Sequence, residues 1–518
     1  VTLNVEAAQS GVTSLGTLTA LTVNGNVSID GGTVKLDGNY PTGTNNVALG
    51  NTALDSLTSG NENTAIGAVA LTANTSGCYN VAVGDNALAA NTTGNDNTTI
   101  GMRSLLNNTT GINNTGVGRN ALRENTTAAK NTAVGSSSLA CNTTGTRNTA
   151  VGFCSLTTNT TGDDNTAFGT ESLRANTTGA NNVAVGKNAL VANTTGDENT
   201  AVGCNTLGAN TTADNNTAIG AFALDTNTEG HSNVAVGRSA LTANTTADNN
   251  TAVGFSALSS NTTGADNAAF GRRALNSNTT AAQNVAIGTC ALYTTTTGAN
   301  NTSVGNYSSK LNTTGASNVA IGYAALCTNT TGAENVAVGK DSLKASTTAS
   351  SNTAVGCAAL FGATTGGANT AMGIYAGYRV TTGSSNALFG YNAGANITTG
   401  ISNHVLGSSA GTDAVFNVTS ENNRIVVGNN NATNAYIKID WTVTSDLRDK
   451  TNFGNVPHGL DFVNKLEPVS FQFKKSREND TPHGNVKYGF KAQDILALEG
   501  EDNVIINNEN TDNLKMTN

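Results

Sequence analysis

Apolar and polar positions recur with a fixed period of 17 residues over most of the chain. Each unit opens with asparagine, carries an apolar residue at its fourth position and has glycine at its fifth, as in the stretch from Asn80 to Gly84. The first unit begins at Asn46 and the last at Asn403, so 21 steps of 17 residues give 22 copies without an insertion. A short period of this kind predicts a stack of like units, each contacting only its neighbours.

Each unit is predicted to contain one short strand and two turns. Its second and fourth positions are β-branched or apolar and flank a small residue, so the two larger side chains should share one face of a strand. The glycine suits a turn with positive φ, the leucine at the ninth position returns toward the interior, and an Asn-Thr-Thr-Gly segment makes the second turn. Stacking would bury two apolar ladders, with Val83 over Ile66 and Leu88 over Leu71. The pattern therefore predicts a parallel β-solenoid.

Three further features of the repeats bear on the shape of this solenoid. Coils about 4.8 Å apart would make the stack about 105 Å long. The first asparagine of each unit should stack as a hydrogen-bonded amide ladder, and none of the 4 prolines lies inside a repeat to interrupt strand pairing. The last three units carry Gly377, Gly394 and Gly411 in place of the ninth-position leucine, which predicts that the shaft changes shape there.

The segments on either side of the repeats have a different pattern. Residues 1–45 alternate as strands do and contain Asn-Gly and Gly-Gly turn signals, so we expect a β connector. Residues 46–411 form the shaft, and 412–444 are interpreted as a β transition segment with two strand-like runs. From 445 to 518 helix formers, Phe, Lys and Pro appear, and we expect a small α+β domain with a short helix at 459–466. The fold class is thus mainly β: a β-roll of 17-residue coils followed by an α+β domain.

Composition narrows the possible functions. Aromatic residues are 5% of the chain and charged residues 12%, so the core must be thin. The net charge is -9 with both signs scattered, which argues against a nucleic-acid partner, and no run of about 18 apolar residues predicts membrane insertion. The 7 cysteines form no CxxC pair and have no companion histidine cluster, so we expect them to be small buried fillers, with neither a metal nor a cofactor.

A candidate reactive pair lies where the C-terminal domain begins: Ser445 stands five residues before Lys450, with Asp446 and Arg448 between them. A serine hydroxyl is a weak nucleophile until a base removes its proton, and lysine is a base only if burial or a nearby cation lowers its pKa. Three more segments follow in order, at 458–461, 466–471 and 488–494. Together these residues resemble the intramolecular chaperone auto-processing domain of endosialidase tailspikes and many tail fibres.

The resemblance implies assembly followed by self-cleavage. In that family the domain helps three chains assemble and is then released by cleavage at the serine of a Ser-Lys dyad. It implies that Ser445 is the nucleophile and Lys450 the base, with Asp446 and Arg448 in support. An N-to-O acyl shift would cut Thr444–Ser445, although the resemblance places the cut only next to Ser445. In the alternative interpretation Ser445 caps a turn and Lys450 is a surface charge. Family members continue into a helical tail, so we expect this domain to be truncated.

The repeats resemble the head repeats of trimeric autotransporter adhesins, and related repeats occur in viral tail fibres. The likeness rests on the Asn-x-Ala-(Val/Ile)-Gly unit and covers residues 46–411. It implies a left-handed parallel β-roll in which three chains pack side by side with their apolar faces at the axis. The unit is longer here than in the adhesin heads, which leaves the cross-section of the coil open.

These patterns favour a structural and host-attachment fibre on the surface of a virion, with no enzyme activity beyond a single-turnover self-cleavage. The expected partners are two further copies of the chain in a homotrimer, a host cell-surface receptor or glycan, and other virion proteins bound through a region upstream of Val1. We expect no nucleic-acid partner and no membrane insertion.

Two other functions stay open. One is a bacterial trimeric adhesin on the cell surface that carries the same chaperone module. The other is a carbohydrate-degrading tailspike, which needs paired carboxylates in a groove. Asp163 and Asp164 are such a pair, but they stand among variable surface positions of the repeat. Charges at those positions are expected to solvate the rod, so none is assigned to a receptor; they include Arg103, Arg123, Arg174, Asp197 and Glu198.

Overall fold

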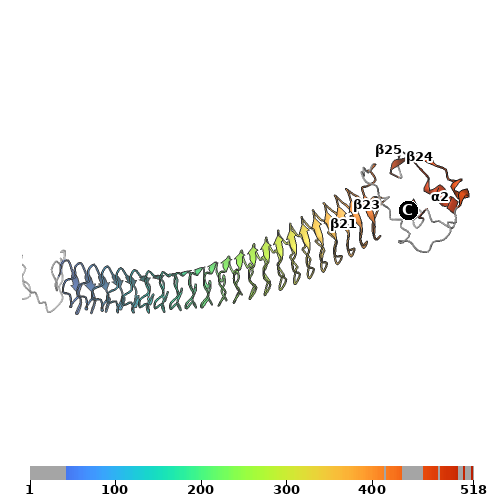
Figure 1. Cartoon of the computed structure of the whole chain (residues 1–518). Coiled ribbons are helices and arrows are strands. Elements are labelled where there is room, and N and C mark those ends of the chain that lie inside the picture. Colours follow the sequence, from blue (N-terminus) through green and yellow to red (C-terminus); the bar gives the residue numbers. More distant parts are fainter. Residues whose placement is uncertain are drawn as a thin grey trace, which may run out of the picture.

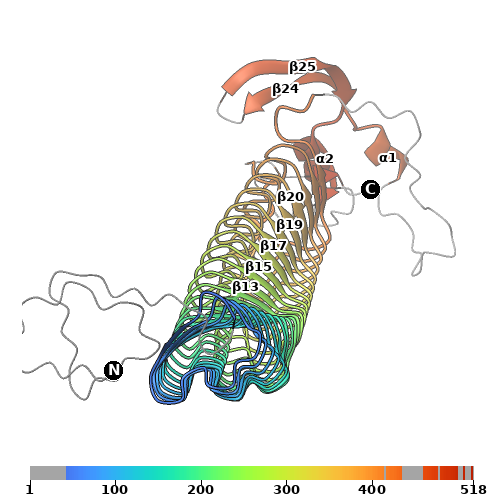
Figure 2. The same cartoon turned by 90° about the vertical axis from the view of Figure 1, so that its left-hand side faces the viewer.

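The computed structural model describes the repeats and parts of the C-terminal region. The described residues are 43–413, 416–433, 459–476, 479–499, 506–507 and 515–516. Figure 1 shows the repeats as one long, gently curved rod of stacked coils, and in the view of Figure 2 successive coils keep nearly the same outline. The connector expected at 1–45 lies almost wholly outside the described residues.

Each coil contributes one three-residue strand to a single parallel sheet. Residues 17 positions apart are paired, so Val47 lies opposite Thr64 and Leu49 opposite Ile66. The predicted β-solenoid of 17-residue coils is confirmed. The strands are β1 (Val47–Leu49), β2 (Thr64–Ile66), β3 (Val81–Val83), β4 (Thr98–Ile100), β5 (Thr115–Val117), β6 (Thr132–Val134), β7 (Thr149–Val151), β8 (Thr166–Phe168), β9 (Val183–Val185), β10 (Thr200–Val202), β11 (Thr217–Ile219), β12 (Val234–Val236), β13 (Thr251–Val253), β14 (Ala268–Phe270), β15 (Val285–Ile287), β16 (Thr302–Val304), β17 (Val319–Ile321), β18 (Val336–Val338), β19 (Thr353–Val355), β20 (Thr370–Met372), β21 (Ala387–Phe389) and β22 (His404–Leu406).

The sheet continues for one strand beyond the last 17-residue repeat. Strand β23 (Ile425–Val427) pairs in parallel with β22, with Val405 opposite Val426. The paired residues are here 21 positions apart, so the last coil is four residues longer than the others. Arg424 stands where earlier coils have asparagine, and its backbone N–H still donates to Oδ1 of Asn403 at 3.0 Å. The contact between coils therefore survives the loss of the repeat.

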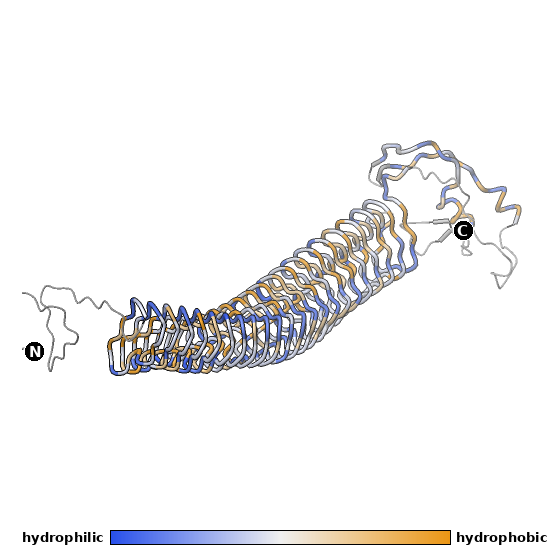
Figure 3. Tube along the Cα trace, turned by 60° about the vertical axis from the view of Figure 1, so that its left-hand side comes forward, coloured by the Kyte–Doolittle hydropathy of each residue, from blue (hydrophilic) through white to orange (hydrophobic). Residues whose placement is uncertain are grey.

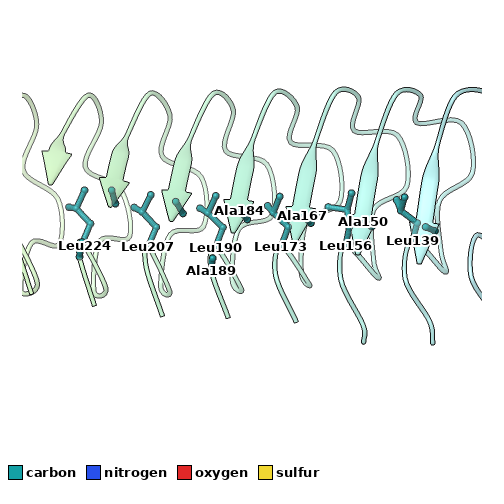
Figure 4. Packing of buried hydrophobic residues seen from close by; sticks show 14 of the residues in the cluster. Leu139, Ala150, Leu156, Ala167, Leu173, Ala184, Ala189, Leu190, Leu207 and Leu224 are labelled. Carbon is teal, nitrogen blue, oxygen red and sulfur yellow. The ribbon is translucent and has the colours of Figure 1, made fainter. Parts of the chain in front are cut away.

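The interior of the rod is a ladder of leucine and alanine. Leu88 and Leu190 are fully buried, and so are the third-position alanines, such as Ala82 and Ala184. In Figure 4 the labelled leucines form one row along the rod, with the alanines of the strands beside them. Stacking therefore buries the apolar groups that one coil alone would leave in water. The expected leucine ladder is confirmed.

The expectation that the fourth-position residues are also buried is wrong. Ile66 and Val83 pair in register as expected, but Ile66 is 37% exposed and Val83 is only half-buried. The alanine between the two outer positions faces the core instead. A tight interior explains the choice, since even a Cβ atom added at the equivalent Gly116 would lie 2.6 Å from Cδ1 of Leu105. Small side chains therefore prevail at this position, and the larger Leu388 and Val405 occur where glycine replaces the ninth-position leucine.

The expected amide ladder is present at the first position of the repeat. Oδ1 of Asn80 accepts the backbone N–H of Asn97 at 3.1 Å, and Nδ2 of Asn80 donates to the carbonyl oxygen of Gly94 at 2.9 Å. The side chain is fully buried, so each bond replaces one that water would otherwise make. Asn80 thereby ties its coil both to the next coil and to its own second turn.

A second amide ladder runs through the twelfth position, which the sequence had suggested was only a turn. Nδ2 of Asn91 donates to Oδ1 of Asn74 at 2.9 Å and to the carbonyl oxygen of Gly94 at 3.0 Å. The same Gly94 carbonyl accepts from Asn80, so the two ladders meet at this turn. Thr92 adds a third contact between coils, because its Oγ1 donates to the carbonyl oxygen of Thr109 at 3.0 Å.

The glycine at the fifth position is required by both conformation and space. Gly84 has φ of 139°, a value open to glycine alone among the ordinary residues. A Cβ atom there would lie 2.6 Å from the carbonyl oxygen of Gly101 in the next coil. The turn predicted at this position is confirmed, and any side chain would push two coils apart.

Near its C-terminal end the rod keeps its strand register, but different side chains fill its interior. Strands β20 to β22 pair with the same spacing as the others. At Gly377 the space of the missing leucine is occupied from other positions, since a Cβ there would lie 2.7 Å from Cδ1 of Leu388 and 3.4 Å from Cγ2 of Val380. Val380 replaces the buried asparagine of the twelfth position. The change of shape expected here is therefore an exchange of apolar volume inside an unchanged sheet.

The C-terminal region has a different architecture. It contains the helices α1 (Leu460–Val463) and α2 (Ala492–Glu499) and the strands β24 (Val469–Ser476), β25 (Asn479–Gly489), β26 (Ile506–Asn507) and β27 (Lys515–Met516). Strands β24 and β25 form an antiparallel hairpin, and β26 pairs antiparallel with β27. The expected small α+β region is confirmed.

Candidate functional site

The hairpin of the C-terminal region brings together two segments that the sequence had singled out. Val469 pairs with Gly489, and Phe471 pairs with Lys487. The segment at 466–471 therefore lies beside the start of the segment at 488–494, although their nearest ends are 17 positions apart in sequence. Helix α1 begins after Gly459 and includes Asp461 from the first of the three segments.

Helix α2 supplies the few buried side chains of this region. Ile495 and Glu499 are 3% and 5% exposed, and they are the only buried side chains in the described parts of 459–499. Lys491 and Asp494 form an ion pair of 3.2 Å near the start of the helix. These two side chains make only a small interior, although the C-terminal region contains many apolar residues.

Several large apolar side chains of the C-terminal region lie in water. Tyr488 is 86% exposed and Leu460 74%, and Phe473, Val463 and Val486 are all more than half exposed. So many large apolar side chains exposed within one short region indicate contact with another molecule. A single chain therefore leaves uncovered the surface that its C-terminal segments create.

The structure does not place the candidate Ser-Lys dyad. Ser445, Asp446, Arg448 and Lys450 all lie outside the described residues, as does Thr444 on the other side of the expected cut. Their roles as nucleophile, base and supporting groups stay predictions.

Comparison with known proteins bears on this part of the chain. Residues 445–505 match the model of a family described as chaperone of endosialidase. The match contains the Ser445 to Lys450 segment together with α1, β24, β25 and α2. No curated protein and no solved structure matches the chain. The C-terminal segment is thus similar to an intramolecular chaperone domain, in agreement with the resemblance seen in its motifs.

On the rod, the outer face of the sheet is an apolar stripe. The fourth position of most repeats projects from this face, so apolar groups recur from coil to coil, as the hydropathy colouring of Figure 3 shows for the rod as a whole. Ile100 is 46% exposed and Phe168 is 56% exposed. Isolated exposed apolar residues are ordinary, but a stripe along a whole rod indicates association. Its most exposed members include Leu49, Ile66, Ile100, Phe168, Ile219, Phe270, Ile287, Ile321, Met372, Phe389 and Leu406.

The paired acidic residues of the repeats are engaged in contacts between coils. Oδ1 of Asp163 accepts the backbone N–H of Thr146 at 2.6 Å. Asp164 accepts from Nε and Nη2 of Arg147 at 2.6 and 2.7 Å, and the guanidinium lowers the pKa of the Asp164 carboxyl. Both side chains therefore join neighbouring coils, which gives this pair a structural role.

The expectation that the cysteines are buried fillers is wrong for most of them. Cys290 is buried, whereas Cys204 is exposed and the other five are half-buried. All seven occupy variable positions of the repeat, where the period does not require a small apolar residue. Within the described ranges, no three His, Cys, Asp or Glu side chains lie close enough to hold a metal ion. No helix in the described part of the chain is long and apolar enough to cross a membrane.

Proposed function

We propose that this chain is the shaft and C-terminal chaperone of a homotrimeric attachment fibre carried on a virion. The observation that carries the proposal is the match at 445–505, C-terminal to a rod whose outer sheet face carries an apolar stripe. Three such faces packed at a common axis would remove the stripe from water, which is favourable by about 25 cal/mol for each Å² of apolar surface buried. The exposed side chains of the C-terminal region supply a second surface for the same association.

In the proposed maturation step, the chaperone domain leaves the fibre by one intramolecular reaction. Lys450 in its neutral form accepts the proton of the Ser445 hydroxyl, and Oγ bonds to the carbonyl carbon of Thr444. The C–N bond between the two residues breaks, and the departing nitrogen takes a proton to become a free amine. Water then opens the ester, which leaves a carboxylate on Thr444 and restores the hydroxyl of Ser445. No cofactor enters this balance.

The fibre would contact a host cell-surface receptor or glycan along the rod and other virion proteins through a region upstream of Val1. A rod of repeated coils holds its surface positions rigidly in line, so many weak contacts can be made at once. This arrangement suits attachment to a repetitive surface better than turnover of a substrate.

Expression of the wild-type chain beside Ser445→Ala tests the proposal. By intact mass the wild type should lose its last 74 residues, while Ser445→Ala keeps the full 52.1 kDa. Native mass should show trimers for both. Ser470→Ala is the matched control, since it removes an exposed hydroxyl of the same domain and should be cut like the wild type. If wild type and Ser445→Ala both stay full length and monomeric, the proposed dyad and trimer are wrong.

A further inference from the structure

Aromatic side chains gather on one wall of the rod near its C-terminal end. Residues 307–391 are 85 of the 518 residues, yet they contain five of the 10 tyrosines. These tyrosines occupy the sixth, seventh and tenth positions of the repeat, which follow the turn at the fifth-position glycine and so lie off the strand face. We call this surface the aromatic wall; it consists of Tyr307, Tyr323, Phe361, Tyr375, Tyr378 and Tyr391.

The rings of the aromatic wall touch across successive coils. Phe361 and Tyr378 are stacked, with ring centroids 5.1 Å apart. Tyr378 meets Tyr375 edge-on at 5.5 Å, and Tyr375 meets Tyr391 edge-on at 6.4 Å. Tyr391 is nevertheless 54% exposed. Four rings from three consecutive coils thus form a continuous platform that remains open to water.

The other end of the wall is built in the same way and carries cations. Tyr307 and Tyr323 meet edge-on at 6.1 Å, and Tyr323 is 51% exposed. Nζ of Lys310 lies 5.3 Å from the ring centroid of Tyr307, and Nζ of Lys344 lies 5.7 Å from that of Phe361. Ammonium groups over aromatic faces are held near the rings by the ring quadrupole. The wall therefore offers aromatic and cationic groups side by side.

The charge of this segment is opposite to that of the whole chain. Residues 307–391 contain four Lys and Arg and two Asp and Glu, a net charge of +2, whereas the chain carries -9. Lys344 is neutralised by Asp341 at 2.8 Å. Lys310, Lys340 and Arg379 form no ion pair with any residue that the structure describes. No described carboxylate neutralises these three side chains, and Lys310 lies over the ring of Tyr307, so their charge is available to an anionic partner.

We propose that the aromatic wall binds an acidic polysaccharide that lies along the rod. Aromatic rings pack against the C–H faces of sugar rings, tyrosine hydroxyls can donate to or accept from sugar hydroxyls, and the free cations meet carboxylate or sulfate groups. The rings and cations are spread over six consecutive coils that stack about 4.8 Å apart, so an extended polymer of sugars can contact several of them at once along the wall. The inference specifies the partner of the attachment fibre and rests on that proposed function.

Contact between copies of the chain is a less suitable use of this wall. Identical walls packed together would bring Lys310, Lys340 and Arg379 of one copy toward the same cations of another, and like charges in an interface are unfavourable. The apolar stripe of the sheet offers copies of the chain a surface without this penalty. The aromatic wall thus remains available for a partner of opposite charge.

Binding of the cleaved trimeric protein to immobilised alginate and chondroitin sulfate, with neutral dextran as reference, tests the inference. The wild type should bind both acidic polymers, more weakly at high salt, and bind dextran much less. Tyr375→Ser combined with Tyr378→Ser leaves the charge unchanged and should weaken binding about thirtyfold, because two lost aromatic contacts of about 1 kcal/mol each amount to about 2 kcal/mol. Lys310→Gln combined with Arg379→Gln should also weaken binding and reduce its dependence on salt.

Phe153→Ser is the matched control, since Phe153 is 55% exposed at the sixth position of an earlier repeat and lies outside the aromatic wall. Its binding should equal that of the wild type. The inference is wrong if the wild-type trimer binds neither acidic polymer, if Phe153→Ser weakens binding as much as the tyrosine pair, or if the tyrosine pair changes only the oligomeric state. A cleaved trimer that binds no polysaccharide overturns this inference alone, and an uncleaved monomer that still binds overturns the assembly alone.

Discussion

The rod and the C-terminal region differ in how far they bury their apolar side chains. In the rod, a fully buried residue such as Leu190 packs against its own equivalents one period away, and buried amides such as Asn193 bond to theirs. In the C-terminal region Tyr488 and Leu460 are mostly exposed although the backbone of the hairpin is paired. A stack of coils completes its interior from one chain, whereas the C-terminal segments leave most of their apolar side chains exposed. The difference shows that the repeat builds a core within one chain, while the C-terminal region, like the outer face of the sheet, leaves apolar surface uncovered.

The largest effect is expected from breaking the contact between coils at a glycine. Gly186 has φ of 130°, and a Cβ atom there would lie 2.5 Å from the carbonyl oxygen of Gly203. Gly186→Val should destabilise the rod by about 3 kcal/mol or more, through strain and separation of two coils. Hydrogen exchange should show lost protection in the coils on either side. Lys187→Val adds the same side chain at the next, exposed position and should leave exchange unchanged.

A substitution in the C-terminal region should instead weaken the association of chains and leave the folding of the rod unchanged. Tyr488→Ala should weaken trimer formation by about 2 kcal/mol, as expected for an exposed aromatic group that becomes buried between chains, and leave the melting of the rod unchanged. Each variant is made in the Ser445→Ala background, so that the C-terminal domain is retained. Native mass spectrometry of a dilution series then measures the fraction of trimer. Lys465→Ala, at an exposed position after α1 in the same C-terminal region, is the control. Equal trimer fractions for both variants would contradict a contact at Tyr488.

A smaller and stabilising effect is expected where the second amide ladder is interrupted. Thr295 replaces asparagine at a fully buried position, and neither its Oγ1 nor Oδ1 of Asn278 has a hydrogen-bond partner within the described residues. Thr295→Asn should restore the bonds that Asn91 makes in its own coil and raise stability by about 1 kcal/mol. Thermal or denaturant unfolding checks the gain. Thr297→Asn adds the same amide at an exposed position, and an equal gain there would show that the ladder is not responsible.

The smallest effect concerns charge on the surface of the rod. The bidentate contact of Arg147 lowers the pKa of Asp164 below its ordinary value. A depressed carboxyl pKa in the folded state stabilises the fold above about pH 4, and this contribution is lost as the pH falls through the folded pKa. Asp164→Asn should therefore lower the melting temperature at neutral pH by no more than about 1 °C, because the pair is exposed, and leave it unchanged at low pH. A larger loss at low pH would contradict this assignment.

Prediction from the sequence succeeded where the period alone decides the contact. In a solenoid the partner of each residue is its equivalent one period later, so the spacing from Asn80 to Asn97 is enough to predict both the strand register and the first amide ladder. The C-terminal match was likewise visible in ordered motifs. The dyad of Ser445 and Lys450 has no such internal check, because it occurs once and lies outside the described residues.

The period does not decide which side of a strand faces inward, because strict alternation shows only that the two faces differ. Only the tertiary structure shows that the small Ala82 faces the core while Val83 lies on the surface, since the buried leucines beside the strand leave little space for the third-position side chain. The same holds for β23, whose longer coil breaks the period but keeps the pairing. The sequence by itself determined which residues repeat and hence which coils touch. The three-dimensional packing decided which of them are buried, because burial depends on the distance between walls that the sequence does not state.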